Sequence, residues 1–490
     1  MRKAGILLPI SSIPSKYGIG TFSKSAYDFV DFLHEAGQSL WQILPLGPTG
    51  FGDSPYQSYS TFAGNPYNID LDEFVNNGWL TEEACSLSDS VTPNKIDYEK
   101  ISTLRFKLLR IAFLNSKIVE DVDFQRFVKE NEEWLLDYSL FMALKEKFHG
   151  LSWQAWDEPI KFRKETEVNK YKKELKDEID FYGFQQYFFR KQWLALKTYA
   201  NQLGIEIIGD IPIYVALDCA DTWANPSLFQ FDENLKPIAV SGCPPDAFST
   251  TGQLWGNPLY HWEEHRKQNY AWWVNRIAYS FDIYDILRID HFRGFDEYYV
   301  IPYADTTAEF GEWKQGPGYE LFQAIKKNVG NKPIIAEDLG YLTKTVKKLL
   351  KQCKYPGMKV LQFAFQAKGD SEYLPHNAIQ NSIMYTGTHD NDTIVGWYYA
   401  LSKADQKFAK KYAQVRKKEN LHWDFIRLAL GSCSDTAIIP LQDYLGYGSE
   451  ARINTPSTLG NNWNWRFEAK ACTTKLAKEI RNLTKLYRRI

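Results

Sequence analysis

The stretch YDILRIDHFRG, residues 284–294, begins as a buried strand and ends in charged side chains. Its first six residues, Tyr284–Ile289, form a short apolar run typical of a parallel strand that is covered on both faces. Side chains alternate along a strand, so Arg288 and Asp290 are predicted to point the same way. The stretch therefore predicts a buried strand with an arginine and an aspartate paired at its carboxyl end.

Seven other short apolar runs have the same character and end in polar, Gly or Pro residues. They are Gly5–Ile10, Leu40–Leu44, Ile205–Ile208, Pro333–Ala336, Lys359–Phe365, Ser382–Tyr385 and Ala437–Leu441. Segments with helical periodicity lie between most of them; for example, Phe322, Ile325 and Val329 share one helix face. Strand alternating with helix eight times predicts an α/β fold, a (β/α)8 TIM barrel. An open doubly wound sheet is the alternative.

Two intervals are too long for a simple strand–helix unit. Residues 47–204 follow the second strand, and within them residues 60–200 are predicted to form an inserted, mainly helical subdomain. Residues 211–283 follow the third strand as a second insertion. The barrel with these insertions is expected to span residues 1–490.

The second insertion contains the breaker-rich stretch SGCPPDAFSTTGQLWGNP, Ser241–Pro258. Long loops of this composition are usually functional, and this one also carries the aromatic residues Phe248 and Trp255. We interpret it as a lid or binding loop.

Composition excludes several classes of protein. The chain has 490 residues, 44% of them hydrophobic, and a net charge of -2, so no basic excess is available to hold nucleic acid. The six cysteines lack C-x-x-C spacing, which indicates reduced thiols in a cytoplasmic protein. No apolar stretch reaches membrane-spanning length, and the N-terminal run lacks the features of a signal peptide. The expected protein is cytoplasmic, with no nucleic-acid or membrane partner.

Three acidic clusters follow three of the predicted strands, and in a barrel these strand ends meet on one face. They are Asp290, Glu337-Asp338 and His389-Asp390. Arg288 is expected to keep Asp290 ionised, as a nucleophile must be. The surrounding acids, Asp338 among them, are expected to raise the pKa of Glu337, as an acid catalyst requires. Two carboxyls in opposite charge states are typical of glycoside chemistry, with Asp390 binding sugar hydroxyls.

Each cluster by itself has a structural explanation, such as an ion pair or a helix cap. A metal-dependent barrel enzyme also stays open, because acid clusters bind Mg²⁺. The 16 Trp, 30 Tyr and 30 Phe residues suit either a core or sugar stacking. Dinucleotide, P-loop, zinc-protease and serine-hydrolase motifs are absent from the sequence.

The sequence resembles the amylomaltase or disproportionating-enzyme family, glucanotransferases allied to the α-amylase clan. The motifs that carry the resemblance run from end to end: SPYQSYSTFAGNPYNIDL (54–71), GDIPIYVALDCADTW (209–223), PPDAFSTTGQLWGNP (244–258), RIDHFRG (288–294), AEDLG (336–340), YPGMKVLQFAF (355–365), LPHN (374–377), GTHDNDT (387–393) and GNNWNWR (460–466).

The resemblance implies a 4-α-glucanotransferase that moves α-1,4-glucan segments by a retaining double displacement. It assigns Asp290 as nucleophile, Glu337 as acid/base and Asp390 as transition-state stabiliser. The sugar contacts that it implies are Arg288, His389, Asp210, Trp255, Asn462, Tyr56 and Tyr59. Maltooligosaccharides or other α-1,4-glucans are the expected partners, and the mechanism needs no cofactor or metal.

Two positions depart from some relatives: Gln366 replaces an acidic residue, and Ala247 replaces an aromatic one. Both changes are expected to alter the grip on the sugar. An α-glucan hydrolase or branching enzyme of the same clan is the alternative function. A carbohydrate-binding protein without catalysis is a third reading, which the presence of all three carboxyls disfavours.

Overall fold

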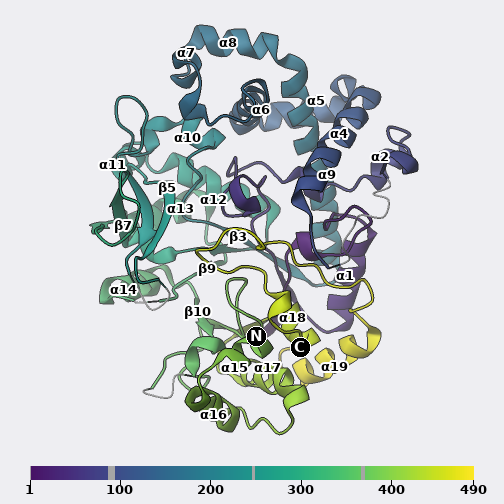
Figure 1. The fold of residues 1–490 in the computed structure, drawn as a ribbon, viewed down its shortest axis with the longest axis vertical. Coiled ribbons are helices and arrows are strands. Elements are labelled where there is room, and N and C mark those ends of the chain that lie inside the picture. The colour runs from purple at the N-terminus through teal and green to yellow at the C-terminus, as the bar shows by residue number, and fades with distance from the viewer. Residues whose placement is uncertain (1, 86–93, 246–248, 341, 366–369) are drawn as a thin grey trace.

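The eight apolar runs form eight parallel strands around a nearly closed barrel (Figure 1). The computed structural model describes residues 2–85, 94–245, 249–340, 342–365 and 370–490. The barrel strands are β1 (Lys3–Leu7), β2 (Leu40–Gln42), β3 (Glu206–Ile211), β6 (Ile286–Ile289), β9 (Ile334–Ala336), β10 (Gly357–Val360), β11 (Ser382–Tyr385) and β12 (Thr436–Pro440).

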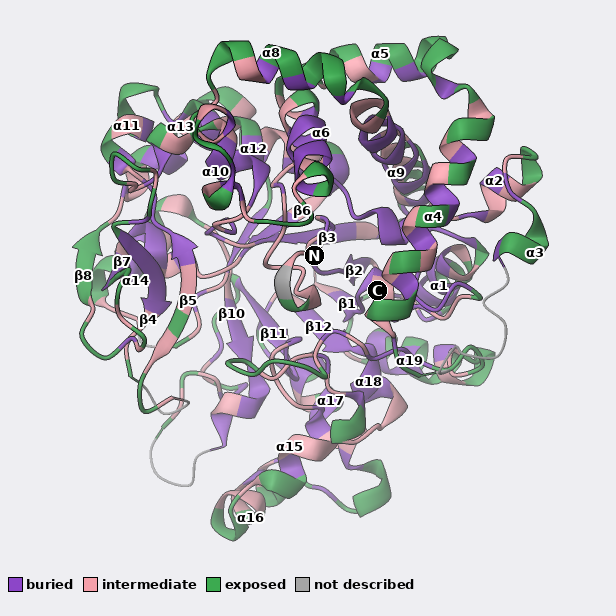
Figure 2. Ribbon diagram, turned by 45° about the horizontal axis from the view of Figure 1, so that its top comes forward, coloured by how far each residue is buried: buried purple, intermediate pink, exposed green. Residues whose placement is uncertain are grey.

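The strand order confirms the barrel and excludes the doubly wound sheet. The order is β10-β11-β12-β1-β2-β3-β6-β9, so each strand lies beside its sequence neighbour in the barrel and the order never reverses. Across the remaining gap, the backbone N–H of Ala336 donates to the carbonyl of Pro356 at 3.0 Å. The strands are buried almost throughout (Figure 2), which explains their apolar sequences.

Close packing at the strand interface requires small residues at certain positions. Gly5 in β1 is one of them, because a Cβ there would lie 2.5 Å from both the Cβ and the carbonyl oxygen of Leu40 in β2. The neighbouring Trp41 is completely buried, and its indole N–H donates to the carbonyl of Leu8 at 2.9 Å. Tight contact and satisfied polar groups together fix this part of the barrel.

Four of the predicted strands end earlier than the apolar pattern suggests, and in two of them a 3₁₀ helix follows. The run Gly5–Ile10 contains β1 only to Leu7, and Ile10–Ser12 turns into a 3₁₀ helix after Pro9. The run Lys359–Phe365 is a strand only to Val360, after which Leu361–Ala364 forms a 3₁₀ helix. Both extensions are buried, so the sequence signal reported burial rather than extended backbone.

Helices fill the intervals between strands. α1 (Lys24–Glu35) follows β1. Between β2 and β3 lie α2 (Asp72–Asn76), α3 (Glu82–Cys85), α4 (Tyr98–Ser116), α5 (Val122–Glu130), α6 (Glu132–Lys147), α7 (Glu158–Lys161), α8 (Glu165–Glu174) and α9 (Lys176–Gln202). Later come α10 (Ala220–Ala224), α11 (Trp262–Lys267), α12 (Ala271–Ile283), α13 (Tyr319–Val329), α14 (Lys344–Cys353), α15 (Ile394–Ala400), α16 (Lys403–Tyr412), α17 (Leu421–Gly431), α18 (Leu441–Leu445) and α19 (Thr474–Leu486). No helix in the described part of the chain is both long and apolar enough to cross a membrane.

A second sheet, which the sequence reasoning missed, stands beside the barrel (Figure 1). It is antiparallel, in the order β5-β4-β7-β8, with β4 (Ala239–Cys243), β5 (Gln253–Pro258), β7 (Glu297–Pro302) and β8 (Glu312–Gln315). Both ends of the supposed loop Ser241–Pro258 are therefore strands. Gly242, one of the glycines that suggested a loop, has a packing role, since a Cβ there would lie 2.2 Å from the carbonyl oxygen of Gln253. Phe248 lies outside the described residues.

The two ends of the chain lie together at the amino-terminal ends of the strands (Figure 1). The side chains of Arg2 and Arg489 both donate to the carbonyl of Leu430, at 3.0 and 2.8 Å. Arg489 also donates to the carbonyl of Lys3 at 3.0 Å, where β1 begins. These bonds place both ends on the face of the barrel opposite the carboxyl ends of the strands.

The packing at Gly5 can be tested with a matched pair of glycine substitutions. Gly5→Ala should lower the free energy of unfolding by about 1–3 kcal/mol, because the added methyl group overlaps the backbone of β2. Gly183→Ala in α9 is the control: its Cβ would lie 3.5 Å from the Phe124 ring, an ordinary contact, and alanine favours the helix by up to about 1 kcal/mol. Equal stabilities of the two variants in urea unfolding would contradict this account of the strand contact.

Candidate active site

The registry of three neighbouring strands brings acidic and basic side chains to one end of the barrel. Asp210 in β3 lies opposite Arg288 in β6, and Ile289 in β6 lies opposite Ala336 in β9. The residues that directly follow these last two, Asp290 and Glu337, are therefore neighbours at the carboxyl ends of their strands. This is the face on which barrel enzymes build their active sites.

Arg288 pairs with two carboxylates inside the barrel. Its guanidinium donates to Asp210 Oδ2, and its Nη2 lies 2.9 Å from Asp290 Oδ1. The side chains of Arg288 and Asp210 are 3% and 0% exposed, whereas that of Asp290 is 29% exposed. Burial opposes the charge on Arg288, but the two carboxylates raise its pKa well above the ordinary value. The guanidinium is therefore a permanent cation, and Asp290 is the member of the group that reaches solvent.

Asp290 and Glu337 form an electrostatically coupled pair. Burial raises the pKa of Asp290 despite the nearby Arg288, which differs from the simple expectation that the arginine would dominate. Burial and the charge of Asp290 raise the pKa of Glu337 to about 7. Because Asp290 hydrogen-bonds directly to the cation, the proton that the pair holds near neutral pH belongs on Glu337.

The backbone fixes the Glu337 carboxyl group. Its Oε2 accepts from the backbone N–H of His291 at 2.8 Å, and its Oε1 accepts from that of Leu339 at 2.6 Å. His291 adopts a left-handed conformation, with φ +52°, which turns its N–H toward Glu337. The residue after Asp290 thus holds the carboxyl group that is coupled to Asp290.

Asp338 does not take part in this cluster in the way the sequence suggested. Its carboxylate is buried and accepts from the backbone N–H of Met358, in β10, at 2.6 Å. Successive residues point to opposite sides of an extended chain, so Asp338 faces the next strand while Glu337 faces the barrel opening. The neighbouring charge that raises the pKa of Glu337 is that of Asp290.

A loop after β11 supplies the third carboxylate. Although burial opposes ionisation, contacts with His389 and Asn454 lower the pKa of Asp390 to about 2. His389 Nε2 lies 3.3 Å from Asp390 Oδ2, and Asn454 Nδ2 donates to Oδ1 at 2.6 Å. Arg452 donates to the backbone carbonyl of Asp390 at 2.8 Å. Sequence reasoning missed Arg452 and Asn454, which lie more than 60 residues from Asp390 in the chain and belong to no motif that pointed to them.

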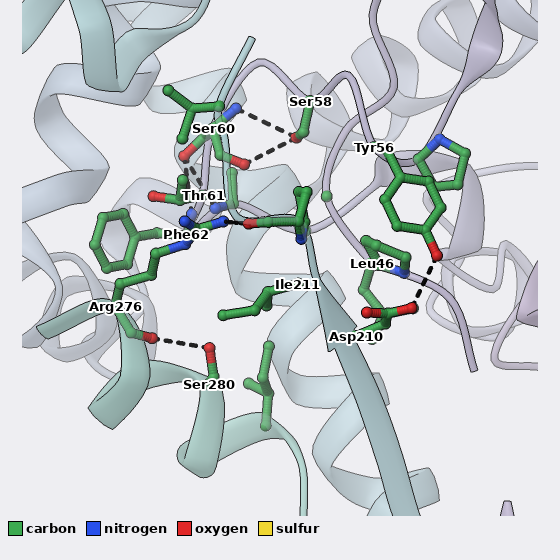
Figure 3. A pocket seen from close by; sticks show the side chains of 18 of the residues that line it. Leu46, Tyr56, Ser58, Ser60, Thr61, Phe62, Asp210, Ile211, Arg276 and Ser280 are labelled. Atoms are coloured by element: carbon green, nitrogen blue, oxygen red, sulfur yellow. Dashed lines mark hydrogen bonds between the residues drawn. The ribbon is translucent and has the colours of Figure 1, made fainter. Parts of the chain in front are cut away.

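Tyr56 connects the two sides of the site. Its hydroxyl donates to Asp210 Oδ2 at 2.8 Å, and Figure 3 shows the ring directing this hydroxyl at the carboxylate. The same ring stacks on His389, with centroids 5.1 Å apart, and lies 5.8 Å from the Trp463 ring. Strand β3 and the loop that carries Asp390 are thus joined through one aromatic side chain.

Trp255 approaches the site from the second sheet. Its ring meets that of His291 edge to face, with centroids 4.8 Å apart. Burial lowers the pKa of His291 to about 3, so its imidazole is neutral. An indole face beside the carboxyl pair is a surface on which the C–H groups of a sugar can stack.

Two of the predicted site residues lie farther from the carboxyl groups. The amide of Asn462 is bonded within its own loop, to the N–H of Thr455 at 3.0 Å and the carbonyl of Thr458 at 3.0 Å. Tyr59 lines a separate cavity of about 610 Å³ between the segment 48–67 and the inserted helices α4, α6 and α9. Ala247 and Gln366 lie outside the described residues.

The arrangement suits acid–base and covalent chemistry at a sugar carbon. It offers a carboxyl group that keeps its proton to about pH 7, a second one beside an arginine, and a third that is ionised. Within the described residues, no group of three or more His, Cys, Asp or Glu side chains has the arrangement of a metal site.

Comparison with known proteins gives one consistent family. A family model described as 4-alpha-glucanotransferase matches residues 8–472. A 4-alpha-glucanotransferase of Clostridium butyricum is 50% identical over 484 residues, 98% of this chain and 99% of that protein. One from Thermus thermophilus is 43% identical over 477 residues, 95% of this chain and 94% of that protein.

Solved structures agree. An amylomaltase from Streptococcus agalactiae, in complex with acarbose, superposes with a TM-score of 0.97 at 40% identity, and all of both chains is covered. An amylomaltase from Corynebacterium glutamicum, only 17% identical, shares the fold with a TM-score of 0.81 over 99% of this chain and 75% of that one.

Removing the buried cation tests its place in the site. Arg288→Met should lower the free energy of unfolding by about 3–5 kcal/mol at pH 7, because the buried Asp210 and the partly buried Asp290 lose their counterion. Burial already raises the pKa of Asp290 and Arg288 opposes that rise, so without the cation its pKa should rise further, and the loss of stability should shrink as pH falls from 7 to 5.

The control for this experiment is Arg266→Met. Arg266 pairs with Glu320 at the surface, both side chains being 50% exposed, and its loss should cost less than about 1 kcal/mol. Urea unfolding of both variants at each pH gives the comparison. A pH-independent loss in Arg288→Met would show that the carboxylates do not depend on this charge.

Proposed function

This chain belongs to the 4-alpha-glucanotransferase family, and from that premise we propose that it moves α-1,4-glucan segments from a donor to the 4-hydroxyl of an acceptor glucan or glucose. The proposed mechanism is a retaining double displacement through a covalent glycosyl-enzyme. The observation that carries it is the pairing of Asp290 with Arg288 beside Glu337, whose pKa is raised to about 7. This reaction needs two neighbouring carboxyl groups, one ionised to act as the nucleophile and one protonated to act as the acid.

In the first half of the reaction, Asp290 attacks the anomeric carbon of the donor. Arg288 holds its Oδ1, so Oδ2 is the oxygen that forms the new bond. The bond from the anomeric carbon to the departing 4-oxygen breaks, and Glu337 gives that oxygen its proton. Glu337, now ionised, retains the two backbone N–H donors of His291 and Leu339, which stabilise the charge.

In the second half, the 4-hydroxyl of an acceptor attacks the same carbon. Glu337 accepts the hydroxyl proton and Asp290 departs as a carboxylate. One α-1,4 bond has replaced another, and two inversions leave the anomeric configuration unchanged. Asp390, ionised over the whole neutral range, stabilises the positive charge that develops on the ring in both steps.

The proposed sugar contacts surround this pair. Tyr56, His389 and Trp255 present rings on either side of it, and Asp210 and Arg288 form its polar floor. Asn462 and Tyr59 are proposed to contact more distant glucose units. Asn462 lies in the loop that it shares with Thr455, and Tyr59 lines the cavity between the segment 48–67 and the inserted helices. Transfer prevails over hydrolysis when the acceptor is oriented, since oriented groups reach effective concentrations of about 10⁵ M or more, far above that of water.

The proposed activity predicts a specific product pattern from maltotriose. The purified protein should produce glucose and a ladder of longer maltooligosaccharides, with the total number of reducing ends nearly constant. Chromatography of the products together with a reducing-end assay measures both quantities. Rising reducing ends with only glucose and maltose would identify a hydrolase instead, and unchanged maltotriose would argue against catalysis on this substrate.

The two carboxyl roles can be separated with a donor that does not need an acid. Glu337→Gln should lose about 10²–10⁴-fold of its activity on maltotriose, because the leaving oxygen is no longer protonated. It should recover on α-maltotriosyl fluoride with azide, since fluoride departs and azide attacks without proton transfer. Asp290→Asn should lose a factor of at least about 10³ with both donors, because no covalent intermediate forms.

Asp338→Asn is the matched control for these variants. Its carboxyl group is adjacent in sequence but turned toward Met358, and asparagine retains an acceptor for that N–H. Its activity should stay within a few-fold of the wild type. Recovery of Asp290→Asn with the fluoride donor, or failure of Glu337→Gln to recover, would contradict the assigned roles.

A further inference from the structure

The loop that presents His389 and Asp390 has its two ends close together. It consists of residues 387–393 and lies between the end of β11 and the start of α15. Thr386 directly follows β11, and Ile394 is the first residue of α15. Any side chain that binds both Thr386 and Ile394 therefore fixes the base of the loop.

Asp443, in the short helix α18, makes this connection. Its Oδ2 accepts from the hydroxyl of Thr386, and its Oδ1 accepts from the backbone N–H of Ile394 at 2.7 Å. One carboxyl group thus binds each end of the loop with a separate oxygen. The residue is 57 positions from Thr386, so the contact is made by the fold and not by local turn geometry.

Asp443 is costly to bury, and no cation among the described residues forms an ion pair with it. It is 1% exposed. Burial raises its pKa to about 7, the hydrogen bonds from Ile394 and Thr386 oppose that rise, and the nearby charge of Asp392 adds to it. A buried carboxyl group without a counterion lowers stability unless its hydrogen bonds are complete. A role beyond packing explains why an acid stands here.

Other residues of the segment after β12 also form hydrogen bonds with this loop. Ser449 donates to the Asp392 side chain at 2.6 Å, and Asn454 binds both Asp390 Oδ1 and, through its own N–H at 3.1 Å, the carbonyl of His389. Residues 441–454 therefore form a cradle for the loop. Among the described residues, Asp443 is the one whose side chain hydrogen-bonds both Thr386 and Ile394, at the two ends of the loop.

We propose that Asp443 is a positioning residue that fixes loop 387–393 and so sets where His389 and Asp390 stand at the carboxyl face of the barrel. The inference rests on the proposed function, in which Asp390 stabilises the transition state. Asp443 contacts no reacting atom; it acts through the backbone of the loop. A displacement of about 1 Å in a stabilising group costs on the order of 10²-fold in rate.

Three variants test the role of the two bonds. Asp443→Asn replaces one acceptor oxygen with an amide NH₂ group, which can only donate, Thr386→Val removes the hydroxyl with little change in shape, and Thr386→Ser keeps the hydroxyl. We expect kcat for maltotriose disproportionation to fall about 10–100-fold in Asp443→Asn and Thr386→Val, with KM within about twofold. Thr386→Ser should stay within about threefold of the wild type. Hydrogen exchange at residues 387–394 should be faster in the first two variants only.

Asp285→Asn separates positioning from general loss of stability. Asp285 accepts from the N–H of Ile207 at 2.8 Å near the opposite, amino-terminal end of the barrel strands. This control should lower the melting temperature without changing kcat of the folded protein. If Asp443→Asn does not fold, the two threonine variants alone decide the question.

Two results would overturn the inference. One is wild-type kcat in folded Thr386→Val or Asp443→Asn, and the other is equal kcat in the valine and serine variants. Asp390→Asn distinguishes this failure from failure of the proposed function. If Asp390→Asn retains wild-type kcat, the assigned role of Asp390 is wrong; if it is inactive while the Asp443 and Thr386 variants are unaffected, only the positioning role is wrong.

Discussion

The arrangement of the carboxyl face of this barrel depends on the two ion pairs of the Arg288 guanidinium. It is a buried cation between two carboxylates, Asp290 directly after its own strand and Asp210 on the neighbouring strand. From Asp210 a chain of contacts runs through the hydroxyl of Tyr56 to the stacked ring of His389 and on to Asp390. Groups from β3, β6 and the loop after β11 are therefore arranged around one positive charge. Since a buried charge is tolerated only when it is paired, the ion pairs and the geometry of the site stand or fall together.

The site divides its acids by environment rather than by residue type. Asp390 has a histidine and an asparagine as partners and a pKa of about 2, whereas Glu337 has backbone donors, a charged neighbour and a pKa of about 7. These differences come from the fold: adjacent strands put Glu337 beside Asp290, and the segment after β12 brings Asn454 to Asp390. That division is the basis of the proposed covalent route through Asp290 with proton transfer at Glu337. The chain belongs to the 4-alpha-glucanotransferase family.

The sequence was informative where a structural signal is local. Each of the eight barrel strands overlaps a predicted apolar run bounded by polar or breaker residues, although several strand ends differ from the ends of the runs. Three strands of the second sheet lack that signal: β4 and β5 contain glycines typical of loops, and the four residues of β8 are all exposed. The fourth strand, β7, has a buried apolar run and was overlooked. At the site, Arg288 and Asp290 share a strand face, so their pairing could be predicted. Asn454, Arg452 and Asp443 could not be, because their partners are about 60 residues away and only the folded chain brings them together.

Arg2 and Arg489 both donate hydrogen bonds to the carbonyl of Leu430, and this has a consequence for the topology of the chain. Both ends are anchored on the side of the barrel opposite the carboxyl groups. The order of the strands around the barrel therefore does not require that β1 come first in the chain. A short peptide joining the ends would make a ring of strand–helix units in which no unit is first. New ends could then be opened in a surface connection on that same side, and the permuted chain would still present Arg288 and its carboxylates to a long polymer that approaches from the open side.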